Sequence, residues 1–162
     1  MTDALGPTAA AVLAAARARL DGAPREALGE WATGRRLLGF GRSPRIVRVG
    51  EAWHLGVLLL GEDALSATGE ILRAREDAVR GFTAHSQRER AERAAAAFRG
   101  GFAEGETVHL GWAPIDVDAV DAGGTSGPLS SAGGRAMIRW SASGAPRPLA
   151  DYVADQLALL GW

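Results

Sequence analysis

The 162-residue sequence contains no cysteine, no lysine and no asparagine. Without cysteine the chain has no disulfides, iron–sulfur clusters, cysteine-based zinc sites or thiol catalysis. Without lysine it has no P-loop lysine, no lysine Schiff base and no Ser-x-x-Lys acylation site, because the guanidinium of arginine stays protonated. All 18 basic residues are arginines. These absences remove many classes of enzyme from consideration.

Long apolar runs are also missing. No stretch approaches the roughly 18 consecutive apolar residues of a membrane span, and residues 1–4 lack the basic start of a signal peptide. We therefore expect a cytoplasmic protein that has no membrane partner. The length, with 47% hydrophobic and 23% charged residues, predicts a single domain over residues 1–162.

Four segments have the apolar spacing of amphipathic helices. The first runs from residue 7 to 20, and the second, residues 24–33, places Ala27, Leu28 and Trp31 on one face.

The other two helices are expected later in the chain. Ser86 and Glu89 have the spacing of a capping box for a helix that reaches Phe98. Pro148 opens the last helix, whose apolar face would consist of Leu149, Val153, Leu157 and Leu160.

Five segments have the composition or alternation of β-strands, namely residues 46–49, 53–60, 65–72, 107–112 and 136–140. Residues 61–63 would form the turn of a hairpin, whereas residues 116–134, rich in Gly, Ser and Asp, are expected to be a loop. Strands and helices are grouped and do not alternate. We therefore predict an α+β fold, with an antiparallel sheet of about five strands and about four helices, two N-terminal, one inserted and one C-terminal.

His54 and Glu70 are the first candidates for a site, because a carboxylate can orient an imidazole for general acid–base work. The hairpin register decides whether they share a face. If Leu60 pairs with Leu65, the two side chains point to opposite faces, whereas pairing of Gly61 with Leu65 puts them diagonally on one face. The non-catalytic alternative is a solvated glutamate beside a hydrogen-bonded histidine.

His109 and Asp116 could join His54 in a two-histidine, one-carboxylate metal site. The spacing contains neither His-Glu-x-x-His nor His-x-His, so we expect no metal and no cofactor. A small hydrolase or metal-dependent enzyme that uses His54 with Glu70, or His109 with Asp116, remains an alternative.

Charge is distributed unevenly along the chain. Residues 35–48 carry five arginines and no acid, and residues 100–134 carry five acids and no base. We favour pairing of the two segments with each other, or their solvation. Binding of nucleic acid or a phosphate ligand through the arginines is a second alternative, which the pI of about 6.3 makes weaker because nucleic-acid-binding domains are usually basic. The arginines are Arg35, Arg36, Arg42, Arg45 and Arg48.

Residues 45–75 carry a resemblance to a known family. The segments are Ala52–Leu60, Ala67-Thr68-Gly69 and Arg73-Ala74. They resemble a family of small actinobacterial proteins without an assigned activity, some of which carry the label glutaminase. The resemblance implies an actinobacterial source and the cytoplasm. It implies no activity, because serine-type glutaminases use a Ser-x-x-Lys nucleophile and this chain has no lysine.

These patterns favour a non-catalytic domain that acts by binding or protein association. We also expect a homodimer, because the strand 53–60 would be apolar on both faces and helices packed on one face of the sheet would leave much of the other face apolar. One face would carry Trp53, Leu55, Val57 and Leu59, and the other His54, Gly56, Leu58 and Leu60. The alternative is that helices lie on both faces or that the loop 116–134 folds over the sheet.

Overall fold

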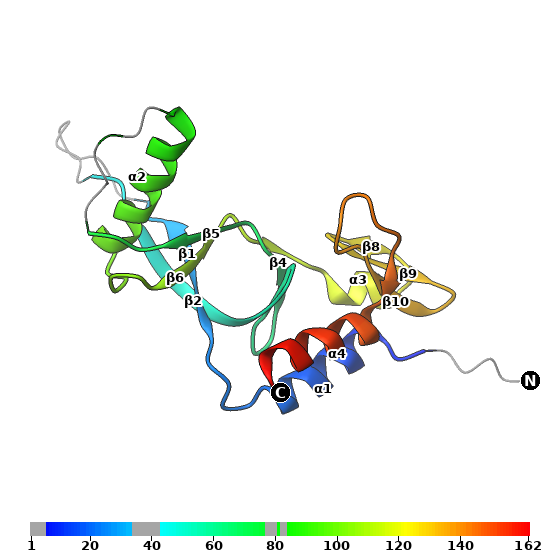
Figure 1. Ribbon diagram of the computed structural model, residues 1–162. Helices are drawn as coiled ribbons and strands as arrows, with labels where there is room; N and C mark the ends of the chain where they lie inside the picture. The colour runs from blue at the N-terminus through cyan, green and yellow to red at the C-terminus, as the bar shows by residue number, and fades with distance from the viewer. Residues whose placement is uncertain (1–5, 34–42, 77–80, 82–83) are drawn as a thin grey trace, which may run out of the picture. The chain divides into compact units, whose positions relative to one another are not determined.

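The computed structural model describes residues 6–33, 43–76, 81 and 84–162, and it has an α+β fold, as predicted (Figure 1). Four helices and eleven strands occur within these residues. The chain forms two compact units, each with its own apolar core. Unit 1 comprises Met1–Arg25, Ala52–Thr68 and Ala113–Trp162, and unit 2 comprises Glu26–Glu51 and Gly69–Trp112. The single domain expected from the chain length stays a prediction.

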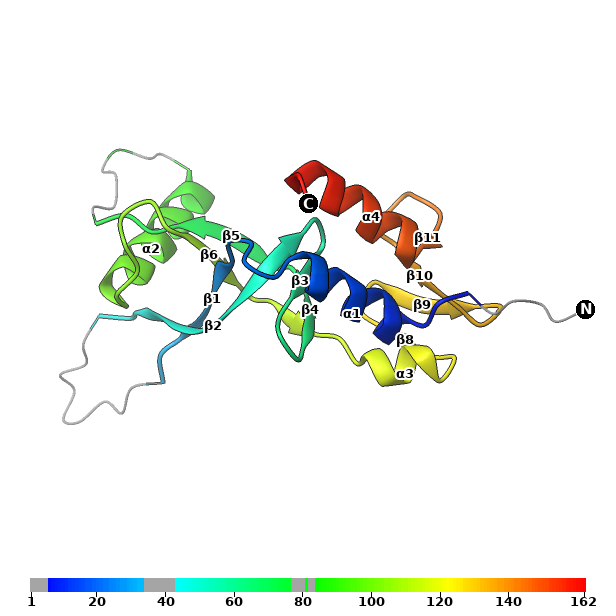
Figure 2. The same cartoon turned by 90° about the horizontal axis from the view of Figure 1, so that it is seen from below.

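Unit 1 contains helices α1 (Ala9–Arg19), α3 (Val117–Asp121) and α4 (Leu149–Leu160). Helix α1 begins where the spacing predicts, because the hydroxyl of Thr8 accepts a hydrogen bond from the Ala11 N–H at 3.1 Å. The carboxylate of Asp121 accepts hydrogen bonds from the first two amides of α1, at 2.6 and 3.0 Å. This carboxylate joins the end of α3 to the positive end of α1, while α4 packs alongside α1 (Figure 2).

The strands of unit 1 form two antiparallel groups. The end of β2 (Ile46–Leu55) pairs with β3 (Leu58–Leu60), which pairs with β4 (Leu65–Ala67), which pairs with β7 (Ala113–Pro114). The second group has the order β11-β10-β9-β8. Its members are β8 (Thr125–Ser126), β9 (Leu129–Ala132), β10 (Arg135–Ile138) and β11 (Arg147–Pro148). The loop predicted for residues 116–134 is therefore wrong, because α3, β8 and β9 lie within it.

The apolar run 53–60 is a hairpin, and its prediction as one strand is wrong. Gly56, with φ +63°, begins a two-residue turn, and Leu55 pairs with Leu58 across it. Trp53 likewise pairs with Leu60, so these four apolar residues share a face and enter one core. The predicted division of residues 53–60 between two faces of one strand, on which the dimer argument rested, therefore fails.

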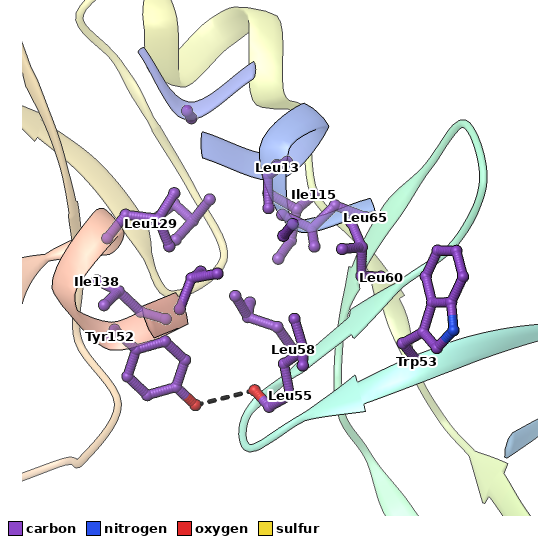
Figure 3. Close-up of a cluster of buried hydrophobic side chains, with 14 of the residues drawn as sticks. Leu13, Trp53, Leu55, Leu58, Leu60, Leu65, Ile115, Leu129, Ile138 and Tyr152 are labelled. Carbon is purple, nitrogen blue, oxygen red and sulfur yellow. Dashed lines mark hydrogen bonds between the residues drawn. The ribbon is translucent and has the colours of Figure 1, made fainter. Parts of the chain in front are cut away.

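Figure 3 shows this core, in which leucines of the hairpin meet side chains of α1, α4 and β9–β10. Tyr152 of α4 is 3% exposed, and its hydroxyl binds the turn of the hairpin. The hydroxyl donates to the carbonyl of Leu55 at 3.0 Å and accepts from the N–H of Val57 at 2.8 Å. Burial raises the pKa of this phenol more than the hydrogen bond from Val57 and the charge of Arg147 lower it.

Unit 2 is a sheet with one covering helix. Its strands follow the order β5-β6-β1-β2, made of β5 (Glu70–Arg73), β6 (Thr107–Leu110), β1 (Glu26–Trp31) and the first half of β2. Strands β1 and β6 are parallel, so the prediction of a purely antiparallel sheet is wrong. Helix α2 (His85–Arg99) packs on one face of these strands, as Figure 1 shows.

The helix predicted for residues 24–33 is strand β1. Its burial alternates, with Ala27 and Gly29 buried and Leu28 partly exposed between them, which is the period of a strand. A Cβ on Gly29 would lie 2.7 Å from side-chain atoms of Ile46 and Val108, so any larger residue here would force these side chains to shift. Pairing with β6 and this close packing override the weak helical spacing of the sequence.

The core of unit 2 lies between the sheet and α2. Apolar side chains of the strands pack against the alanines of α2, of which Ala94–Ala97 are buried. The helix ends at Gly100, where a Cβ would lie 1.5 Å from the carbonyl oxygen of Ile46 in β2. The neighbouring Gly101 has φ +105° but open space around its Cα.

Several boundary predictions also need correction. The capping box is wrong, because α2 begins after Ala84 and its N-cap makes no side-chain hydrogen bond. The strand predicted for 65–72 is divided at residues 68–69 into β4 and β5. Trp140, expected in the strand 136–140, and Leu160, expected on the apolar face of the last helix, are 53% and 49% exposed, because each lies at or beyond the end of its element. Across the described residues, no helix has both the length and the apolar character that a membrane crossing requires.

Candidate functional site

His54 and Glu70 fall in different units. The observed register pairs Leu60 with Leu65, which is the alternative in which the two side chains would point to opposite faces. In addition, β4 ends at Ala67 and Glu70 begins β5, so His54 and Glu70 do not belong to one continuous hairpin. In unit 1, the Nε2 atom of His54 lies 2.8 Å from the carbonyl oxygen of Gly56, across the hairpin turn.

Glu70 is held by an arginine of α2. Its carboxylate forms an ion pair with Arg93, with Oε2 at 2.7 Å from Nε and Oε1 at 3.1 Å from Nη2. Two contacts between a planar guanidinium and a carboxylate fix the orientation of both groups. The carboxylate of Glu70 therefore has a fixed orientation on the face of the sheet that α2 covers.

His109 and Asp116 also fall in different units. His109 is 0% exposed in unit 2, and its Nε2 lies 2.5 Å from the Oε2 of Glu26 in β1. Asp116 caps α3 in unit 1, where its carboxylate accepts the N–H of Ala119 at 2.9 Å. Because a buried imidazole is shielded from a substrate, we interpret the Glu26–His109 pair as structural.

The basic segment is described only in part, since Arg35, Arg36 and Arg42 lie outside the described residues. Arg45 is exposed. Arg48 forms an ion pair with Glu106 and lies over the ring of Phe102, 5.1 Å from its centroid. One arginine of the basic segment thus pairs with an acid of the acidic segment, as expected for pairing.

Glu106 has a lowered pKa. Burial alone would raise it, but the N–H of Ala103, 2.9 Å from Oε2, and the charge of Arg48 outweigh that effect. This carboxylate therefore stays ionised below the usual pH range of a glutamate.

A groove of about 440 Å³ lies entirely within unit 2 and is the strongest candidate for a binding site. Its volume is within the range of about 300 to 1,000 Å³ that is typical of small-molecule sites. A smaller hollow in unit 1, beside Pro7, Arg135 and Asp151, measures about 200 Å³ and falls below that range.

Strand order and direction create this groove. Parallel pairing of Ala27 with Val108 brings the ends of β1 and β6 to the same edge of the sheet. Antiparallel pairing of Glu70 with Leu110 places the start of β5 at that edge too. The lining residues accordingly come from three strand ends: Gly29, Glu30, Trp31, Glu70, Leu110, Gly111 and Trp112.

Two tryptophans line the groove. Trp31 is 45% exposed at the last position of β1. Trp112 is partly buried, and its Nε1–H donates to the carbonyl of Gly29 at 3.2 Å. This hydrogen bond fixes the second indole against the backbone of β1, while the first stays open to a ligand.

Two glutamates border the groove. Glu70 contributes the group that Arg93 orients. Glu30 also borders the groove, but strand alternation directs its exposed side chain to the sheet face opposite Trp31. Within the described ranges, no ion pair is formed by Glu30. The carboxylate on the same sheet face as Trp31 is therefore that of Glu70, whose charge Arg93 balances.

The sequence indicated Glu70 as a site residue but missed the tryptophans. Trp31 was assigned to the apolar face of a helix, and Trp112 to the last position of a strand. The available signal was that each follows a glycine at the end of a strand, in Gly29-Glu30-Trp31 and Gly111-Trp112, where a large aromatic side chain lies at the sheet edge.

No family model matches the chain, and no curated protein or solved structure is significantly similar to it.

Proposed function

We propose that this protein is a non-catalytic binding domain and that the groove of unit 2 is its ligand site. The observation that carries the proposal is the 45% exposed Trp31 beside the anchored Trp112, in a groove of suitable size. Tryptophan is favoured at binding sites because it offers a large, rigid contact area with few rotatable bonds. Strand ends hold these side chains more firmly than a long loop would.

Ligand-observed NMR with a set of neutral, cationic and anionic fragments tests this proposal. We expect saturation transfer to some fragments from the wild type, and its loss in Trp31→Ala. Trp140→Ala is the matched control, because Trp140 is similarly exposed, at 53%, but belongs to unit 1. Fragment binding that survives in Trp31→Ala, or that is absent from the wild type, would contradict the proposal.

The same protein is proposed to act in the cytoplasm as a homodimer. The absence of cysteine supports the compartment. Val49 and Ile71, 48% and 39% exposed, support the dimer because strand alternation places them on the sheet face opposite α2, where a second copy could cover them. Sedimentation equilibrium should give twice 16.8 kDa for the wild type and 16.8 kDa for Val49→Asp. A wild-type mass of 16.8 kDa at all concentrations would refute the dimer.

A further inference from the structure

Charge is balanced on the sheet face that carries the exposed tryptophan of the groove. Ala27 belongs to the core under α2, and strand alternation places Trp31, four residues later in β1, on that same face. Glu70, which pairs with the core residue Leu110, is the one charged side chain on this face among the described lining residues, and Arg93 contacts both of its oxygens. Building on the proposed function, we propose that the ligand places an uncharged aromatic ring against Trp31.

The tryptophans favour an aromatic ring because they offer flat apolar surface. Trp31 is 45% exposed, so a ligand can reach its ring. The hydrogen bond from Nε1 of Trp112 to the carbonyl of Gly29, at 3.2 Å, holds the second indole in one orientation. Contacts between aromatic rings, offset-stacked or edge-to-face, stabilise a complex beyond the gain from buried area. A flat aromatic ring therefore gains more from this groove than a puckered aliphatic ring of the same size.

The ion pair of Glu70 and Arg93 favours a ligand without charge. A charge that leaves water needs an opposite charge close by, and the carboxylate of Glu70 already has its partner. The side chains of Glu70 and Arg93 are 33% and 29% exposed, so water further weakens the field that the pair exerts on a ligand. An uncharged ring enters the groove without losing the hydration of an ion.

A sugar ring suits the groove less well than an aromatic ring. Each hydroxyl of a sugar that leaves water needs a new hydrogen-bond partner. Besides the indoles, the polar side chain that the described lining offers on this face is Glu70, and its oxygens already accept from Arg93. Leu110 and the two glycines of the lining add no polar side chain. The groove thus has aromatic surface but few partners for hydroxyl groups.

Benzyl alcohol, benzoate, the benzylammonium ion and cyclohexylmethanol test the inference, because they differ in charge or in the flatness of one ring. Each is titrated into the full chain at low salt and followed by NMR. We expect benzyl alcohol to bind at least about threefold more tightly than the other three, as an aromatic contact without a charge penalty implies. The preference should be lost in Trp31→Ala and kept in Trp140→Ala.

Several results would overturn the inference. These are equal or tighter binding of cyclohexylmethanol or of either ion, tighter binding of methyl β-glucopyranoside than of benzyl alcohol, and a preference for benzyl alcohol that survives in Trp31→Ala. Binding of none of the compounds would overturn it too. The proposed function has a separate test, because binding of any other fragment that is lost in Trp31→Ala would still support the groove as a site.

Removal of either partner of the ion pair should give the groove a charge preference. Glu70→Gln leaves Arg93 unbalanced, so the affinity for benzoate should rise several-fold relative to benzyl alcohol. Arg93→Gln leaves Glu70 unbalanced, so the benzylammonium ion should gain instead. Glu51→Gln and Arg88→Gln are the matched controls, because both residues are exposed in unit 2 and belong neither to the groove lining nor to the Glu70–Arg93 pair.

Equal effects of the ion-pair variants and their controls would refute the role of balanced charge, and so would unchanged preferences in all of them. Proton–nitrogen correlation spectra show whether each variant is folded. If a variant of the ion pair unfolds, the comparison of the compounds on the wild type decides the inference by itself.

Discussion

Tyr152→Phe should destabilise unit 1 without altering the shape of its core. The substitution removes one oxygen atom that makes two hydrogen bonds to the hairpin, to the carbonyl of Leu55 at 3.0 Å and from the N–H of Val57 at 2.8 Å (Figure 3). The ring itself stays in place because phenylalanine has the same carbon skeleton. The loss of stability therefore measures the hydrogen bonds and not a cavity.

The expected magnitude follows from the burial of the two groups left behind. Leu55 is 0% exposed and Val57 is partly buried, so water replaces the lost bonds poorly. A buried backbone group without a partner costs about 1–3 kcal/mol, and we expect a total loss of about 2 kcal/mol because Val57 is only partly buried. For a chain of this length, that loss lowers the melting temperature by about 4–8 °C.

Urea unfolding followed by far-ultraviolet circular dichroism measures the loss. Thr68→Val is the matched control, because the Thr68 hydroxyl also binds the hairpin but over 3.4 Å, to a Val57 carbonyl that keeps its bond from the Thr68 amide at 3.1 Å. We expect the control to cost less than about 1 kcal/mol. Equal stability of Tyr152→Phe and the wild type would refute the assignment of Tyr152 as the side chain that braces the turn.

The pH dependence gives a second readout from the same residue. Burial raises the pKa of Tyr152 above its usual value of 10.0. The unfolded chain therefore loses this proton at a lower pH than the folded chain, so stability is intact below about pH 10 and falls as the pH rises through the folded pKa. Tyr152 is the single tyrosine, so tyrosinate absorbance follows this group alone, and Tyr152→Phe should lack this alkaline loss.

Three further predictions concern unit 2. Its stability should decline as the pH falls below about 4.5 and through the lowered pKa of Glu106, and Glu106→Gln should flatten that decline in acid titrations followed by circular dichroism. Gly100→Ala should prevent stable folding of the unit, because the new Cβ would collide with the backbone of Ile46. Gly101→Ala should cost only about 1–3 kcal/mol of backbone strain, and equal urea midpoints for the two variants would contradict the close packing of Gly100 on β2. Glu26→Ala should cost about 1–3 kcal/mol because buried His109 loses a partner, and an unchanged midpoint would refute the pair.

Periodicity predicted the elements whose local pattern and tertiary environment agree. Helix α1 was placed to within about two residues, because a proline, a capping threonine and regular apolar spacing all indicate the same start. Strand β6 was found from its alternation, with Val108 and Leu110 inward. In these segments, local preference and packing favour the same structure.

Strand β1 and the β2–β3 hairpin were not predicted, because each depends on partners far away in the sequence. The spacing of Ala27, Leu28 and Trp31 fits a helix, but β6 lies about 80 residues later and its pairing decides the outcome. At the hairpin, a single glycine in an otherwise apolar run divides the strand, and leucines on both sides conceal the turn.

The candidate site was less predictable than the fold. Its lining residues come from three strand ends that only the sheet order brings together, and the error at β1 placed Trp31 in a core. Glu70 was identified, but its partner Arg93 lies on a helix and follows from no sequence spacing. The histidines attracted attention because of their chemistry, whereas the groove depends on tryptophans, whose role is decided by exposure.

The indole N–H signals of the tryptophans test the proposed site most directly. The five tryptophans should give five signals in a proton–nitrogen correlation spectrum of the ¹⁵N-labelled protein. Addition of a fragment that binds the wild type should shift the signals of Trp31 and Trp112 in proportion to its binding, and leave those of Trp53, Trp140 and Trp162 in place. Unshifted signals from Trp31 and Trp112, or larger shifts at the other three, would show that the groove of unit 2 is not the ligand site.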